Sequence, residues 1–403
     1  MIGLERYEGA PVDTLRRATR RAFENLVQLC LEERVDVLLL AGDLFDGDWR
    51  DYGTGLFFCA ALSQLKPAGT RVVLLRGNHD AQSQLTKQLS LPEHVFELPV
   101  RRPGSIVFED IGLAIHGQGF AERAVLDDLT VNYPAPLPGL LNVGMLHSCL
   151  DDRAGHENYA PSSTQVLVQH GYDYWALGHI HTREIVHRDP WIVYPGNLQG
   201  RHMRERGPKG ATLIEAIGGR ISSVEERVLD VVRWQHVRVD TQAFTHPDEL
   251  LAACQDVMLE QAELAGRLVA LRIELWGSSA LHGSLAASPE HWLAELRRLA
   301  NEVGQVWLES LVVNSRARVE LAELRLASGP IGQLAQSLAR MRAEPEELEA
   351  FSAEFSELER RLPRVLREGP LALGLTDVAR TQQELDAVEQ LLLPLLFEAE
   401  GST

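Results

Sequence analysis

Polar side chains that can bind a metal ion follow four separate apolar runs of this sequence. Each run consists mainly of aliphatic or aromatic residues, and the polar residues come at its end or directly after it. Because the carboxyl ends of parallel strands meet at one edge of an open sheet, where ligands bind, we expect these side chains to gather there. In chain order they are Asp43, Asn78, His79, His147, His179 and His181.

Each of these residues taken singly has an ordinary structural explanation. Asp-Gly and Asn-His pairs occur in turns, and a single histidine at a strand end is usually a hydrogen-bonded structural residue. Chance would scatter Asp, Asn and His along the strands, however, and would not deliver them from four strands to one edge. The combination therefore indicates a metal site built from carboxylate, amide and imidazole groups.

The mixture of ligand types narrows the choice of metal. Carboxylate oxygen, amide oxygen and neutral imidazole suit manganese, iron or zinc, whereas magnesium and calcium favour shells of oxygen alone. A shared carboxylate such as that of Asp43 could hold two ions roughly 3.5–4 Å apart, which would clamp a phosphate and activate water. No nucleophilic side chain would then be needed.

The densest basic run of the sequence comes after these strands. It comprises Arg201, His202, Arg204, Arg206 and Lys209. One interpretation is a solvated hairpin, and the other is a contact to nucleic-acid phosphates. The formal net charge of the chain is -18. Because nucleic-acid binding depends on clustered lysine and arginine, any such contact must be a local basic patch.

The elements that must position these side chains follow from the order of the apolar runs. Residues 11–232 alternate β-rich runs with helical stretches, which predicts an α/β domain of layered sheets flanked by helices. Several runs are apolar throughout, as expected of strands that are buried on both faces. We expect helices over 12–33 and 54–65 and strands over 35–42, 71–76, 112–116, 141–147 and 172–178.

Two further regions follow this domain. Residues 233–328 have the order strand, helix, strand, helix, strand, which predicts a small α+β module. Residues 329–403 are acidic and helical, with apolar residues alternately three and four apart, as in an a/d seam. The first seam consists of Leu348, Phe351, Phe355, Leu358 and Leu362, and the second of Leu385, Val388, Leu392 and Leu395. The predicted domains are thus 1–232, 233–328 and 329–403.

The composition is that of an ordinary globular protein. Hydrophobic residues make up 45% of the 403 residues and charged residues 24%. No apolar run approaches the roughly 20 residues of a membrane span, and the first residues lack the layout of a signal peptide. We therefore expect a cytoplasmic protein without a membrane segment. The 4 cysteines are widely scattered, so neither a disulfide framework nor a thiolate zinc site is expected.

The order of the motifs resembles one family. GD-x-x-D, GNHD, an apolar strand ending in histidine, and GHIH occur in this order in calcineurin-like metallophosphoesterases. The stretches GLERYEGAP and YPGNLQGRHMRERGPKG are similar to SbcD-type DNA repair exonuclease subunits, in particular to the YhaO-like branch. The resemblance covers most of the first 230 residues. It implies a layered β-sandwich flanked by helices, with a small α+β capping module and a helical C-terminal tail.

The resemblance also implies roles for the metal-binding residues. Asp43 would bridge two divalent metal ions, which we expect to be manganese. Asn78, His147 and His179 would complete one metal site, and His181 would serve the other.

A catalytic role is implied for His79, which matches the histidine that this family places beside the scissile phosphate. There it would protonate the leaving oxygen or stabilise charge, for which an imidazole is suited near neutral pH. The alternative is an ordinary turn residue. The substrate-binding candidates are Arg201, His202, Arg204 and Lys209.

The implied function is hydrolysis of phosphodiester bonds in DNA by an exonuclease, with endonuclease activity as a further option. The implied partner is an ATPase of the SbcC or YhaN type, bound through the C-terminal helices, and family analogy suggests a homodimer. One alternative is a phosphodiesterase that acts on a small molecule such as a cyclic nucleotide. Another is a scaffold that binds DNA or the ATPase without cutting.

One motif of the family is not found at its expected place. These proteins begin with a strand that ends in Asp-x-His, and nothing before Asp43 has this pattern, since Asp13 is followed by Thr14 and Leu15. We expect either a start that was assigned too late or a naturally shortened chain. In the second case one metal ion would keep only Asp43 and His181, which motivates the scaffold hypothesis.

Overall fold

The computed structural model describes residues 10–45, 52–82, 90–151, 157, 159–318, 329–367, 373–382, 385 and 396. The chain divides into two compact units. The first comprises Met1–His236, Glu260–Leu271 and Gly304–Glu309, and the second comprises Val237–Leu259, Arg272–Val303 and Ser310–Thr403. The division into 1–232, 233–328 and 329–403 stays a prediction.

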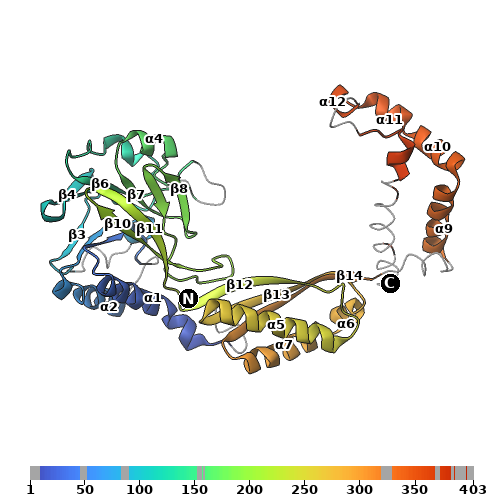
Figure 1. Ribbon diagram of the computed structural model, residues 1–403, viewed down its shortest axis with the longest axis horizontal. Helices are drawn as coiled ribbons and strands as arrows, with labels where there is room; N and C mark the ends of the chain where they lie inside the picture. Colours follow the sequence, from blue (N-terminus) through green and yellow to red (C-terminus); the bar gives the residue numbers. More distant parts are fainter. Residues whose placement is uncertain are drawn as a thin grey trace. The chain divides into compact units, whose positions relative to one another are not determined.

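A small parallel sheet forms one layer of the first unit. Its strand order is β1-β2-β3, and its members are β1 (Val37–Leu40), β2 (Arg71–Leu74) and β3 (Val95–Glu97). Helices α1 (Val12–Glu32) and α2 (Tyr52–Ser63) lie along one side of this unit (Figure 1). Apolar residues of α1 recur at helical spacing, so that Leu26 and Cys30 pack with Leu38 and Leu40 of β1.

A larger sheet forms the second layer, in the order β4-β5-β6-β7-β9-β8. Its strands are β4 (Gly104–Phe108), β5 (Leu113–Gly117), β6 (Leu141–His147), β7 (Tyr174–Gly178), β8 (Glu184–Arg188) and β9 (Trp191–Tyr194). The four inner strands run parallel and the two edge strands antiparallel. Val73 of the first sheet shares a hydrophobic cluster with Ile115 and Val143 of the second, so the sheets pack face to face. The predicted layered α/β fold is thereby confirmed.

The outer face of the larger sheet carries a second cluster, in which Leu167 of helix α4 (Thr164–Gln169) packs with Trp175 of β7. A hairpin then follows, made of β10 (Gly210–Ile217) and β11 (Arg220–Val228). The next elements are β12 (Val232–Asp240), α5 (Pro247–Ala265), β13 (Leu268–Ser279), α6 (His282–Ala287), α7 (Pro289–Val303) and β14 (Val306–Ala317). The strands form a sheet of order β12-β13-β14, and the predicted alternation of strand and helix is confirmed.

The described helices beyond residue 329 are short. They are α9 (Pro330–Ala343), α10 (Pro345–Glu354), α11 (Ser356–Arg361) and α12 (Arg364–Arg367), and the first apolar seam falls on α10 and α11. The helix breaks at Phe355, so Leu348 is buried beside Leu338 and Leu385 while Leu358 is 52% exposed. A continuous seam over 348–362 was therefore wrong, because apolar spacing does not reveal where a helix ends. Of the second seam, Val388, Leu392 and Leu395 lie outside the described residues.

No helix in the described part of the chain combines the length and the apolar character that a membrane span requires.

Candidate metal centre

The first metal-capable side chain comes from a tight turn after β1. Gly42 and Asp43 both have positive φ angles, of 92° and 56°, which turns the backbone sharply at the sheet edge. A Cβ atom on Gly42 would lie 2.6 Å from Nδ1 of His147, so only glycine fits there. This turn brings the Asp43 carboxylate to the carboxyl edge of the strands.

Glycines also allow the other strand ends to come close to His147. A Cβ on Gly77, after β2, would lie 2.7 Å from His147 Cε1, and one on Gly178, at the end of β7, would lie 2.6 Å from Nδ1. Three glycines from three chain segments therefore surround the imidazole of His147. The loops after β1, β2 and β7 can approach the end of β6 only because of these glycines.

His147 is fully buried and has its ring fixed on both sides. Its Nδ1 lies 2.9 Å from the carbonyl oxygen of Ala41, so Nδ1 carries the proton and donates it. Its Nε2 lies 3.0 Å from Asn78 Oδ1 and 3.3 Å from Asp43 Oδ2. In the neutral ring all three of these atoms offer lone pairs to one another. A positive charge, from a proton or a metal ion, is needed to make this arrangement favourable.

The arrangement shifts the pKa values of Asp43 and His147 in opposite directions. Burial opposes a charged ring at His147, but the hydrogen bond and negative charge of Asp43 outweigh burial and raise its pKa. Burial likewise disfavours the Asp43 carboxylate, but the partnership with His147 lowers the pKa of Asp43 to about 2. Each group thus favours the charged form of the other.

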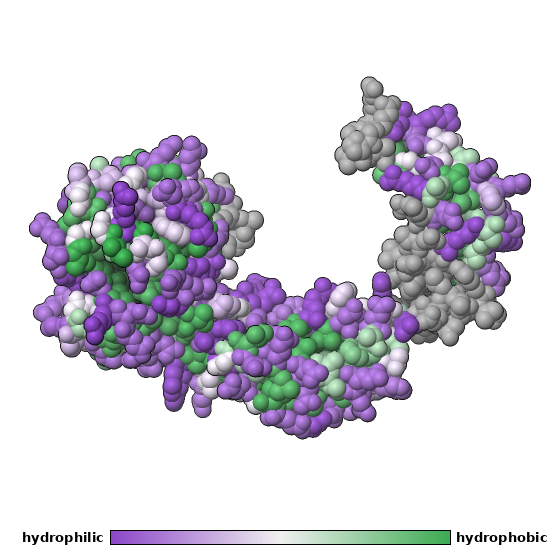
Figure 2. Space-filling view, in the orientation of Figure 1, coloured by the Kyte–Doolittle hydropathy of each residue, from purple (hydrophilic) through white to green (hydrophobic). Residues whose placement is uncertain are grey.

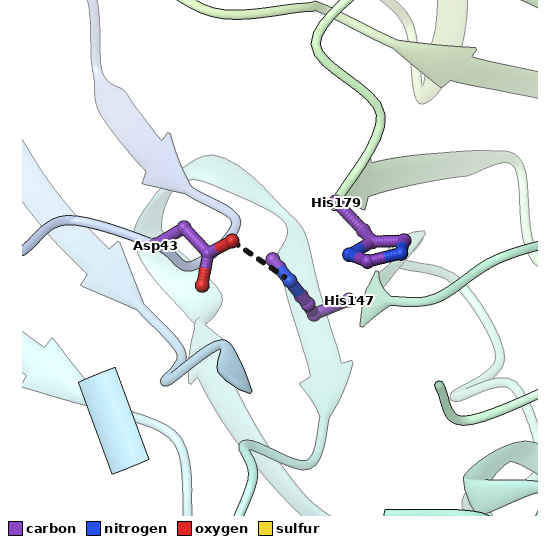
Figure 3. A group of neighbouring side chains, drawn as sticks. All are labelled: Asp43, His147 and His179. Carbon is purple, nitrogen blue, oxygen red and sulfur yellow. Dashed lines mark ion pairs between the residues drawn. The ribbon is translucent and has the colours of Figure 1, made fainter. Parts of the chain in front are cut away.

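His179 completes the group from the end of β7. It has a φ of 92°, a backbone conformation that residues other than glycine rarely adopt. Figure 3 shows Asp43 and His179 on opposite sides of His147. Within the part of the chain that the structure describes, these three residues offer ligand atoms that all lie within 4.8 Å of one another. Oxygen and nitrogen donors in such a set suit a divalent transition metal.

The structure therefore brings together four of the predicted ligands, Asp43, Asn78, His147 and His179. His79 follows Asn78 in the first turn of helix α3 (Asn78–Gln82), and its backbone N–H donates to Asp43 Oδ1 at 3.1 Å. Its catalytic role stays a prediction.

His181 is not part of the group of three around His147. Its Nδ1 lies 2.7 Å from Oε1 of Glu205, and its side chain is 40% exposed. Its role at a second metal ion stays a prediction.

The basic run around residue 205 does not lie wholly at the surface. Arg204 and His202 are exposed, and the backbone N–H of Arg204 donates to His202 Nδ1 at 3.2 Å. Lys209 is only 4% exposed and donates from Nζ to the carbonyl oxygen of His181 at 2.8 Å. Burial lowers the pKa of Lys209, although Glu205 and other nearby acids oppose this. Phosphate contacts by Arg201, His202, Arg204 and Lys209 stay predictions.

Sequence reasoning missed two buried carboxylates. Asp80 accepts hydrogen bonds from the backbone N–H groups of Phe45 and Gly77, each at 3.0 Å, and so joins the loops after β1 and β2. Burial raises the pKa of Asp80 to about 6, with a contribution from the charge of Asp43. Glu205 is 5% exposed. In the sequence, Asp80 is the last residue of GNHD, and Glu205 is the single acidic residue within the basic run 201–209.

Two family models match the chain. The model described as calcineurin-like phosphoesterase matches residues 15–183, which contain the metal-binding group. The model described as metallophosphoesterase YhaO, middle domain, matches residues 234–316, which contain β12, β13 and β14.

Curated relatives are similar over part of their length. The uncharacterized metallophosphoesterase YhaO of Bacillus subtilis is 32% identical over 269 residues, which are 66% of this chain and 65% of the relative. The DNA double-strand break repair protein Mre11 of Methanopyrus kandleri is 27% identical over 45% of this chain and 43% of its own. A protein of Rhodobacter capsulatus that is named as a component of the nuclease SbcCD is 33% identical over 31% and 33%, respectively. The chain thus spans less than two thirds of each of these relatives.

Proposed function

Because the chain belongs to the calcineurin-like metallophosphoesterase family, we propose that it is a metal-dependent phosphodiesterase that acts on DNA. The observation that carries the proposal is the convergence of lone pairs from Asp43, Asn78 and His147 at the carboxyl edge of the sheets. A DNA substrate is supported by the similarity to proteins named for double-strand break repair and for a nuclease.

The residues around His147 fit a divalent metal ion. Asp43, Asn78, His147 and His179 would hold one ion, with manganese proposed because the set mixes oxygen and nitrogen donors. His181, with Asp43 as the shared ligand, would serve a second ion. When bound, the metal supplies positive charge that polarises the phosphate and favours attack by water.

The protein's own groups prepare this site before any substrate arrives. The carbonyl of Ala41 fixes the ring of His147 and leaves Nε2 with its lone pair toward the centre. The N–H of His79 holds Asp43 Oδ1, so the carboxylate is oriented from one side. The imidazole of His79, one residue from the ligand Asn78, would donate a proton to the leaving oxygen.

The finer proposal is an exonuclease, with endonuclease activity as a further option, that works with an ATPase of the SbcC or YhaN type. One similar protein is named as a subunit of a nuclease complex, which supports the existence of a partner. The ATPase would bind the C-terminal helices, whose described part contains only a small hydrophobic cluster around Leu338, Leu348 and Leu385. A homodimer is proposed by family analogy alone.

Linear duplex DNA with Mn²⁺ tests the function directly. We expect release of nucleotides that stops on addition of a chelator and in Asp43→Ala, which also loses the bound metal. Asp127→Ala, at an exposed aspartate outside the site, is the matched control and should keep full activity.

Turnover of a small aryl phosphodiester without cleavage of DNA would contradict the DNA proposal in favour of a small-molecule enzyme. Binding of DNA by a metal-loaded chain that hydrolyses neither substrate would favour the scaffold hypothesis.

A further inference from the structure

Glu205 is a buried carboxylate in the middle of a basic loop. Its neighbours Arg204 and Arg206 are exposed, whereas Glu205 is 5% exposed. Burying a carboxylate is costly unless hydrogen bonds replace those to water. Glu205 Oε2 accepts from the backbone N–H of Arg201 at 2.8 Å, and Oε1 lies 3.4 Å from the Arg201 guanidinium. The remaining strong partner is Nδ1 of His181, at 2.7 Å from Oε1.

The direction of this last hydrogen bond fixes the tautomer of His181. A carboxylate that accepts from Arg201 is held in its ionised form and has no proton to give. His181 must therefore donate from Nδ1, which leaves a lone pair on Nε2 of the neutral ring. Because the His181 side chain is 40% exposed, the ring is accessible to an ion from solvent.

The backbone of His181 is held by the same loop. Its carbonyl oxygen accepts from Nζ of the buried Lys209 at 2.8 Å and from the N–H of Asn197 at 3.3 Å. Gly196, with a φ of 77°, allows this approach, since a Cβ there would lie 3.1 Å from the same oxygen. The ring and the main chain of His181 are thus fixed by a single segment, 196–209.

Hydrogen bonds also hold this segment firmly within the first unit. The side chain of Gln199 donates to the carbonyl of Val232 at 2.6 Å and accepts from the N–H of Val231 at 2.7 Å. The indole of Trp234 donates to the carbonyl of Gly200 at 2.9 Å. Glu205 therefore reaches His181 from a fixed support and not from a solvated hairpin.

We propose that Glu205 is a positioning residue for metal binding, which orients His181 through Nδ1 and so presents Nε2 as a ligand atom. Histidines that bind metals commonly donate their other N–H to a carboxylate, and loss of that partner weakens metal binding by about 10–100-fold. The inference deepens the proposed function, because it rests on His181 as a metal ligand. It also assigns part of the basic run to the support of the metal site.

Two measurements on the metal-free full chain test the proposal. Calorimetric titration with Mn²⁺ gives the affinity of the metal site, and nitrogen NMR of the histidines gives the tautomer of His181. We expect Glu205→Ala to weaken the His181-dependent Mn²⁺ site by about 10–100-fold and to release Nδ1 of His181 from its single tautomer. Glu205→Gln keeps an oxygen acceptor, so it should restore the tautomer and most of the affinity. This rescue keeps the test decisive even if the alanine variant folds poorly.

His181→Ala should lose the same Mn²⁺ site, and the double variant with Glu205→Ala should show no further loss. Glu226→Ala is the matched control, because Glu226 pairs with Arg183, two residues from His181, at 4.0 Å. It should change neither the tautomer nor the affinity. The proposal is wrong if Glu205→Ala lowers only thermal stability, or if His181→Ala binds Mn²⁺ like the parent chain.

Failure of the proposed function would look different from failure of this inference. Chains that lose Mn²⁺ affinity as described, but never cleave DNA, would leave the role of Glu205 intact while removing the nuclease proposal.

Discussion

At the scale of single residues, the contact between Asp43 and His147 couples the site to pH. The folded protein lowers the pKa of Asp43 from 3.8 to about 2 and raises that of His147 above 6.5. The Asp43 contribution to stability is present above 3.8 and is lost as the pH falls through about 2. The His147 contribution is present below 6.5 and is lost as the pH rises through its raised pKa. The metal-free pair therefore stabilises the fold most in mildly acidic solution.

Asp43→Asn tests this coupling. At about pH 5 the variant should lower the free energy of unfolding of the metal-free chain by on the order of 2 kcal/mol, because asparagine loses the interaction of the ionised carboxylate with protonated His147. The difference should shrink below about pH 3 and above neutral pH. Urea unfolding of both proteins across this range is the measurement, and a difference that is independent of pH would contradict the expectation.

His79→Ala separates catalysis from metal binding. The imidazole is proposed to donate a proton, whereas the backbone N–H of His79 donates to Asp43 Oδ1, and alanine keeps that N–H. We expect hydrolysis of DNA to fall by about 10²–10⁴-fold while the metal content measured by elemental analysis stays that of the parent chain. Loss of metal in this variant would identify His79 as a ligand or structural residue instead.

At the scale of elements, the site depends on loops from separate strands being held at fixed distances. Glycines 42, 77 and 178 permit the approach, and Asp80 fixes it by bonding the loops after β1 and β2 to each other. Asp80 is only 1% exposed, so water cannot readily take the place of its carboxylate. Loss of these hydrogen bonds therefore lowers the stability of the fold. The carboxylate thus acts as an internal cross-link between two of the loops that carry ligands.

Asp80→Ala should leave the N–H groups of Phe45 and Gly77 without this acceptor. We expect a loss of about 1–3 kcal/mol of stability for each of the two donors and weaker Mn²⁺ binding, since Asp43 and Asn78 lie on the loops that separate. Asp80→Asn retains one acceptor oxygen and should lose about half as much. Denaturant unfolding and Mn²⁺ titration measure the two effects, and unchanged Mn²⁺ affinity would show that the loops are held by other contacts.

At the scale of the whole molecule, charge opposes the proposed substrate. The net charge is -18, and hydrophilic residues cover most of the face shown in Figure 2. Polyanionic DNA can therefore be attracted only by local cations and by bound metal. Among the basic residues of the loop, Arg204 is exposed while Lys209 is committed to the His181 carbonyl. A small number of phosphate contacts, and hence a weak dependence on salt, is expected.

Arg204→Ala measures this contribution. If Arg204 contacts one phosphate, the slope of log affinity against log salt should become less steep by about 0.9, and binding should weaken to a similar extent for all sequences. Fluorescence anisotropy with labelled duplex DNA gives the slope. Arg360→Ala, at an exposed arginine of α11 in the other unit, is the control and should leave it unchanged. Equal slopes in all three proteins would exclude Arg204 as a phosphate contact.

Residue order by itself determined the layered α/β fold and placed Asp43, Asn78 and His147 at the carboxyl ends of strands. Both follow from local information, because apolar runs mark the strands and the residue after each run must lie at the sheet edge. The tertiary structure decided that these strands belong to two sheets packed face to face and not to one. The sequence did not reveal that the helix carrying the first apolar seam breaks at Phe355. A heptad pattern records which positions are apolar but not where the backbone leaves the helix.

Only the tertiary structure decided which atoms face one another. The bond between His181 and Glu205 joins residues 24 apart, and that between His147 and Ala41 joins residues 106 apart. Such pairings depend on how loops from different strands pack, and they turned Glu205 and Lys209 inward from a run that sequence alone treated as a basic surface. The side-chain types were written in the sequence, but the assignment of each lone pair and proton required the folded chain, because a hydrogen bond is a relation in space.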